Sequence, residues 1–104
     1  MLDATFSALS DPTRRSILEF LADGDLSVGE LVDEFSISQS AVSRHLQVLE
    51  HAGLVTRRRD GQRRLCSLNG EPLREADEWI ARYRAFWEAR LDRLDRVLRA
   101  EREK

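Results

Sequence analysis

Apolar side chains recur every three or four residues along most of this chain, a pattern that predicts a mainly helical fold. We expect four short helices before residue 53 and one long helix after residue 70. Asp11 and Pro12 suit the start of the second helix, and Ser27 with Glu30 predicts a capping box at the start of the third. The apolar stripes of the four short helices are Leu2, Phe6 and Leu9; Ile17, Leu18 and Leu21; Leu31, Val32 and Phe35; and Val42, Leu46 and Leu49.

The fourth predicted helix, residues 38–49, has a polar face without a carboxylate. Ser38 suits its cap, and the short break at Ser36-Ile37 joins it to the third helix as a helix-turn-helix. A surface that approaches phosphates and base edges excludes acids and keeps short donors, so we interpret this segment as a DNA-recognition helix. For His45, a structural hydrogen bond is an equally good interpretation. The candidate DNA contacts are Ser38, Gln39, Ser40, Ser43, Arg44, His45 and Gln47, with Gln39 and Arg44 as the expected readers of base edges.

Residues 54–68 change to the pattern of a β-hairpin centred on Asp60-Gly61, a strong two-residue turn signal. The register expected from this turn pairs Val55 with Cys66, Thr56 with Leu65, Arg57 with Arg64, and Arg58 with Arg63. Directly opposed arginines destabilise a hairpin unless an anion lies near them, so we expect a wing that contacts DNA. Its candidate contacts are Arg57, Arg58, Arg59, Arg63 and Arg64. A solubilising edge is the alternative, although that needs only one or two charges.

Pro72 suits the first turn of a last helix, which would be roughly 45 Å long for about thirty residues. Its aromatic and aliphatic stripe exceeds what one small domain covers, so we expect a second copy of the chain to cover it. The candidate dimer-interface residues, on the first and last helices, are Leu2, Phe6, Leu9, Phe86, Trp87, Leu91, Leu94 and Leu98. The expected fold is a dimeric winged helix-turn-helix, mainly α with a β-hairpin wing, in which four helices, two strands and a last helix form a single domain over residues 1–104.

Arg14 and Arg15 lie in the first turn of the second predicted helix, where a cation interacts unfavourably with the helix dipole. We expect salt bridges to acidic neighbours there, with a phosphate contact as the alternative.

The amino-acid composition further limits the range of possible functions. The chain has 104 residues, of which 41% are hydrophobic and 35% charged, and this suits one small domain. No apolar run is long enough for a bilayer and no signal peptide is evident, so we expect a cytoplasmic protein without membrane contact. Cys66 is the only cysteine and His45 and His51 are the only histidines, so we expect no disulfide, metal or other cofactor, and Cys66 should pack as a small hydrophobe. No catalytic motif indicates an enzyme.

Charge is distributed unevenly along the chain. The formal net charge is −2, but residues 38–68 carry six arginines against Glu50 and Asp60, a net of +4. A positive segment in an acidic protein indicates a local site for an anion. Double-stranded DNA is the expected partner, and a winged-helix interaction module that binds an acidic protein through the arginine-rich hairpin is the alternative.

Several motifs together resemble the ArsR/SmtB-type bacterial winged-helix repressors. They are Phe6 to Leu18 (FSALSDPTRRSIL), Ser40 to Leu46 (SAVSRHL), Leu49, Ala52 to Val55 (AGLV) and Arg58 to Gly61 (RRDG). The resemblance covers nearly the whole chain. It implies a homodimer built from the first and last helices, which binds an inverted repeat and usually represses transcription.

The chain departs from the metal-sensing members of that family. Those proteins often carry cysteines in the helix before the turn, or histidine and acidic ligands in the last helix. Here residues 30–35 read ELVDEF, and the last helix contains no histidine. The sequence therefore resembles the metal-independent branch of the family. Its residues do not indicate which effector, if any, the protein binds.

Overall fold

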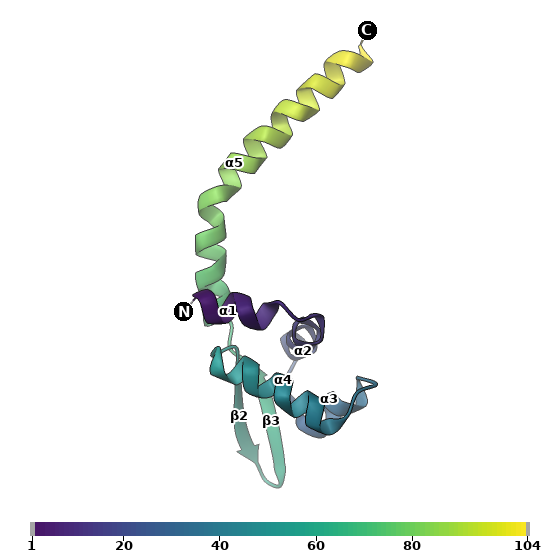
Figure 1. The fold of residues 1–104 in the computed structure, drawn as a ribbon, viewed down its shortest axis with the longest axis vertical. Coiled ribbons are helices and arrows are strands. Elements are labelled where there is room, and N and C mark those ends of the chain that lie inside the picture. The colour runs from purple at the N-terminus through teal and green to yellow at the C-terminus, as the bar shows by residue number, and fades with distance from the viewer. Residues whose placement is uncertain (1, 104) are drawn as a thin grey trace. The chain divides into compact units, whose positions relative to one another are not determined.

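The computed structural model describes residues 2–103, and it divides into two compact units, Met1–Arg74 and Glu75–Lys104. Most of the chain is helical, with a small antiparallel sheet in the first unit, so the predicted winged helix-turn-helix fold is confirmed (Figure 1). In chain order the elements are α1 (Leu2–Leu9), α2 (Pro12–Ala22), β1 (Leu26–Ser27), α3 (Val28–Asp33), α4 (Gln39–His51), β2 (Val55–Asp60), β3 (Arg63–Leu68) and α5 (Glu71–Arg102).

The polar residues expected to cap the helices do so. Asp11 accepts hydrogen bonds from the backbone N–H groups of Thr13 (2.8 Å) and Arg14 (3.2 Å) at the start of α2. Both halves of the capping box between Ser27 and Glu30 are present at the start of α3. Each bond satisfies a backbone donor that has no partner within its helix, which fixes where these helices begin.

A Schellman motif ends α4 and turns the chain into the hairpin. The N–H of Gly53 donates to the Glu50 carbonyl at 2.9 Å, and the N–H of Leu54 donates to the Leu49 carbonyl at 2.9 Å. Gly53 has a φ of +76°, a conformation in which a side chain is strained. Gly53 therefore supplies the left-handed cap at which α4 ends.

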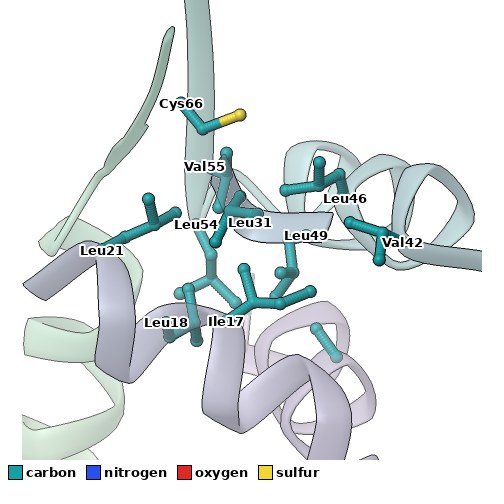
Figure 2. Close-up of a cluster of buried hydrophobic side chains, with 11 residues drawn as sticks. Ile17, Leu18, Leu21, Leu31, Val42, Leu46, Leu49, Leu54, Val55 and Cys66 are labelled. Atoms are coloured by element: carbon teal, nitrogen blue, oxygen red, sulfur yellow. The ribbon is translucent and has the colours of Figure 1, made fainter. Parts of the chain in front are cut away.

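The hydrophobic core lies between the helices and the base of the hairpin. Figure 2 shows side chains from α2, α3, α4 and the hairpin converging on one volume. Burial of each of these larger aliphatic side chains contributes about 1.5–3 kcal/mol relative to exposure. The labelled core residues are Ile17, Leu18, Leu21, Leu31, Val42, Leu46, Leu49, Leu54, Val55 and Cys66.

The sheet has three strands in the order β1-β3-β2, so the predicted two-stranded element order was incomplete. β1 contains only Leu26 and Ser27, which pair with Cys66 and Leu65 of β3. Two residues are too few to show the alternation that identifies a strand in a sequence. The pairing nevertheless ties the start of α3 to the hairpin.

The predicted hairpin register was wrong by two positions. The observed partners are Val55 with Leu68, Thr56 with Ser67, Arg57 with Cys66, Arg58 with Leu65, Arg59 with Arg64, and Asp60 with Arg63. The turn is centred on Gly61-Gln62, because Gly61 (φ +65°) takes the first central position while Gln62 has no positive φ, as in a type II′ turn. One arginine pair is therefore directly opposed instead of two, and Asp60 faces a cation.

Two other expectations differ from the structure. α3 ends at Asp33, before Phe35, whose ring packs edge-on against Phe20 with 5.6 Å between ring centroids. The salt bridges expected for the first turn of α2 are replaced by hydrogen bonds to α1. Arg14 donates from Nε to the Ala8 carbonyl at 2.7 Å, and Arg15 donates from Nη1 to the Leu9 carbonyl at 2.7 Å. The last carbonyls of a helix lack partners, and a two-residue link brings these within reach of the arginines.

The conformation of Gly53 gives a prediction about stability. Gly53→Ala should lower the free energy of unfolding by about 1–2 kcal/mol, because alanine is strained at positive φ. Gly29→Ala is the matched control, since this glycine lies in helical backbone inside α3 and its replacement should raise stability by about 0.5–1 kcal/mol. Urea unfolding followed by circular dichroism at one fixed protein concentration measures both. Equal stability of Gly53→Ala and the wild type would contradict the assigned cap.

Candidate nucleic-acid interface

The outward face of α4 carries the predicted recognition residues. Ser38, Gln39, Ser40, Arg44 and Gln47 are exposed, while Ser43 and His45 are half-buried. The single acidic residue of α4, Glu50, lies in its last turn and forms an ion pair with Arg57. At the other end, Ser38 Oγ accepts a hydrogen bond from the Ala41 N–H at 3.1 Å. The face between these two ends presents amide, hydroxyl and guanidinium groups and no carboxylate.

A groove lies between α4 and the hairpin, which is next to that helix in Figure 1. It has a volume of about 350 Å³ and is lined mainly by polar and cationic side chains. Two segments expected to bind DNA thus share one surface, Gln39 and Ser43 from α4 with Arg57, Arg63 and Arg64 from the hairpin. The rest of the lining, Gln62 and residues 27–29, was not predicted from the sequence. These residues reach the groove only through the shifted turn and the pairing of β1 with β3.

Three of the five hairpin arginines are bound to carboxylates of the same chain. Arg57 pairs with Glu50 of α4, and Arg63 pairs with Glu30 of α3. Arg58 donates from Nη1 to Asp25 at 2.7 Å and to Ser67 Oγ at 2.8 Å. The hydrogen bond from Arg58 holds the pKa of Asp25 below its ordinary value, and the Ser27 N–H, with Arg63 as a further partner, does the same for Glu30. Both carboxylates are therefore ionised at neutral pH.

Arg44, Arg59 and Arg64 are exposed, and within residues 2–103 none of them has a carboxylate partner. Arg59 and Arg64 are directly opposed across the hairpin. Like charges in that position are mutually repulsive, which makes the pair a favourable place for an anion. A second hollow of about 370 Å³ is lined by these two residues with Arg57 and Arg58.

His45 makes the structural contact that the sequence allowed. Its Nδ1 lies 3.4 Å from Nη1 of Arg14, the residue that also binds the Ala8 carbonyl of α1. Because a guanidinium only donates, Nδ1 is the acceptor in this contact. Arg14 thereby links α1, α2 and α4.

Cys66 is fully buried, and burial raises the pKa of its thiol. The expectation that it packs as a small hydrophobe is confirmed, although its partners in the sheet are Arg57 and Leu26. A thiol with a raised pKa forms little of the reactive thiolate.

The residues expected to form the dimer interface differ in exposure. Leu2 and Leu9 are half-buried, and Leu9 packs against the core. The large apolar residues of α5 from Phe86 onward form an exposed stripe, in which Trp87 is 42% and Leu91 61% exposed. Phe6, Phe86, Leu94 and Leu98 are exposed as well.

The described residues lack a metal-binding cluster and a membrane-spanning helix. Residues 2–103 contain no group of three or more His, Cys, Asp and Glu side chains arranged to hold a metal ion. Within the same range, every helix is too short or too polar to cross a membrane.

Comparison with known proteins identifies the family. The family model described as "Bacterial regulatory protein, arsR family" matches residues 11–57. The transcriptional repressor SdpR of Bacillus subtilis is 37% identical over 82 residues, covering 79% of this chain and 91% of SdpR. The HTH-type transcriptional regulator Rv2034 of Mycobacterium tuberculosis is 49% identical over 67 residues, covering 64% of this chain and 63% of the relative. The crystal structure of the ArsR family transcriptional regulator RHA00566 superposes with a TM-score of 0.75 at 33% identity, covering 84% of this chain and 90% of that structure.

These similarities extend from the helix-turn-helix to most of the chain and agree with the observed fold. They confirm a DNA-binding regulator of transcription, and with it the expectation that the chain is not an enzyme. The chain belongs to the arsR family of bacterial regulatory proteins.

Proposed function

We propose that the protein is a homodimeric repressor that binds an inverted repeat in double-stranded DNA. The observation that supports this most directly is the groove in which Gln39 and Ser43 of α4 share a surface with hairpin arginines. A DNA duplex offers partners for both sets of side chains, because base edges line its major groove and phosphates lie along the rim of that groove. The relative SdpR is named as a transcriptional repressor, which supports the repressor role proposed here.

In this proposal each side chain of α4 has a role set by its chemistry. Gln39 and Arg44 read base edges, because an amide and a guanidinium make two-pronged contacts. Ser38, Ser40, Ser43 and Gln47 bind phosphates directly or base edges through water. His45 orients the helix through its contact with Arg14.

The hairpin lies along the DNA backbone. Arg59 and Arg64 bind phosphates, since both are exposed without a carboxylate partner in the described chain. Arg57, Arg58 and Arg63 belong to the same surface, but they begin from ion pairs that a phosphate would have to displace.

Residues 1–104 act as one winged helix-turn-helix domain whose terminal helices dimerise. A second copy covers the stripe formed by Phe86, Trp87, Leu91, Leu94 and Leu98, because exposed apolar surface of this extent favours association. Leu2, Phe6 and Leu9 of α1 complete the interface. Two recognition helices then enter successive major grooves about 34–36 Å apart, as a two-fold operator requires.

Salt dependence separates DNA binding from the alternative of an acidic protein partner. A dimer that contacts six to ten phosphates should lose about 10³–10⁵ in duplex affinity between 50 and 200 mM salt. Fluorescence anisotropy with a labelled duplex measures this loss. Negligible duplex binding at low salt would contradict the proposal.

Arg44 and Arg59 should respond differently to truncation. Arg44→Ala should reduce the preference for an operator over random duplex by about 1–3 kcal/mol, because it removes a two-pronged base contact. Arg59→Ala, the matched contrast, should weaken both duplexes alike, because phosphates carry no sequence information. The operator for this comparison is obtained by selection from a random duplex library. An equal loss on both duplexes for Arg44→Ala would remove its role as a reader.

The dimer proposal predicts the effect of charges on α5. Trp87→Glu and Leu91→Glu should each give monomers, since they place a carboxylate in the apolar stripe. Ala89→Glu is the control, because helical periodicity places residue 89 on the opposite face of α5. Sedimentation equilibrium gives the mass of each variant. A dimeric mass for both stripe variants would reject this interface.

A further inference from the structure

The partners of the hairpin arginines come from three elements outside the hairpin. Asp25 lies between α2 and β1, Glu30 lies in α3, and Glu50 lies in α4. Two of these ion pairs, Asp25 with Arg58 and Glu30 with Arg63, join residues 33 positions apart in sequence. The acidic residues that neutralise the wing are thus placed by the tertiary fold.

In each of these two ion pairs one member has a second hydrogen-bond partner, Glu30 in one pair and Arg58 in the other. Glu30 accepts a hydrogen bond from the Ser27 N–H at 3.0 Å as part of the capping box, so its carboxylate is already oriented when Arg63 approaches. Arg58 donates from Nη1 both to Asp25 at 2.7 Å and to the neighbouring Ser67 hydroxyl at 2.8 Å, so two acceptors hold its guanidinium. Such preorganisation reduces the side-chain entropy lost when an ion pair forms.

The pairs differ in their access to an outside anion. The side chains of Arg58 and Arg63 are 55% and 58% exposed, whereas that of Arg57 is 24% exposed. A phosphate can therefore approach Arg58 and Arg63, and it competes there with a carboxylate that is already in place. Exposed ion pairs are individually weak, so this competition lowers the gain from phosphate binding without abolishing it.

We propose that Asp25 and Glu30 are specificity-determining residues that withhold two hairpin arginines, Arg58 and Arg63, from DNA phosphates. This inference rests on the proposed DNA-binding function. Sequence-independent affinity grows with the number of phosphates that a protein neutralises. Because the carboxylates reduce that number, DNA of any sequence is held less tightly, and a larger share of the affinity comes from the base-reading side chains of α4.

The test removes the carboxylates and measures binding of the 104-residue chain to random duplex. Asp25→Asn and Glu30→Gln each remove a negative charge, and glutamine at residue 30 still completes the capping box. Each variant should bind tighter at low salt, and its slope of log affinity against log salt should steepen by about 0.9 for every arginine that gains a phosphate. Circular dichroism spectra and melting curves confirm that the variants are folded.

Asp33→Asn is the matched control for the general effect of charge. Asp33 is an exposed residue of the same helix as Glu30, it forms no ion pair within the described chain, and its slope should stay at the wild-type value. A double-mutant comparison adds a second control, because Asp25→Asn should have no effect on the slope once Arg58 has been replaced by alanine.

The possible outcomes separate the two proposals. If wild-type protein binds duplex and Asp25→Asn and Glu30→Gln change the slope no more than Asp33→Asn, the withholding role is wrong and DNA binding stands. The same conclusion follows if Asp25→Asn has its full effect in the Arg58→Ala background. Failure of the wild-type protein to bind any duplex at low salt would overturn the proposed function and this inference together.

Discussion

Burial of one side of α4 is the constraint on which the rest of the structure depends. Val42, Leu46 and Leu49 are fully buried and lie at helical spacing, so they fix the rotation of the helix about its own axis. The position of Gln39, Arg44 and the other polar side chains on the outward face follows from that rotation. The recognition surface is thus oriented by apolar packing, which is insensitive to salt, although its proposed contacts are strongly salt-dependent.

The same core fixes the hairpin relative to α4. Val55 and Cys66, at the bases of β2 and β3, pack with the α4 residues (Figure 2). The Schellman motif at Gly53 sets the direction in which the chain leaves the helix. Because two independent features, core packing and a backbone cap, hold the hairpin, the groove between it and α4 is a property of the fold and does not require DNA to form it.

Local signals in the sequence were sufficient for the helices and for the starts of α2, α3 and α4. Asp11, Ser27 and Ser38 cap their helices within three residues of themselves, so each can be recognised from its immediate neighbours. The family resemblance and the apolar stripes predicted the fold, and the polar face without a carboxylate at residues 38–49 predicted the recognition surface of α4. The hairpin register was missed because Asp60-Gly61 is a strong turn signal that the chain does not use. Gly61 satisfies the turn equally well as its first central residue, and only the pairing of whole strands decides between the two registers.

The partners of charged residues depend on distant parts of the chain, and there the sequence was least informative. Arg14 and Arg15 were expected to form salt bridges with acidic residues. They bind carbonyl groups at the end of α1 instead, and these lie within reach only after α1 and α2 have packed together. The hairpin arginines are similar in sequence but not in environment. Arg59 and Arg64 remain exposed. Arg58 and Arg63 form ion pairs with carboxylates of the α2–β1 segment and of α3. A net charge of +4 over residues 38–68 therefore overstates the cationic groups available to an outside anion, because two of the neutralising acids lie outside that segment.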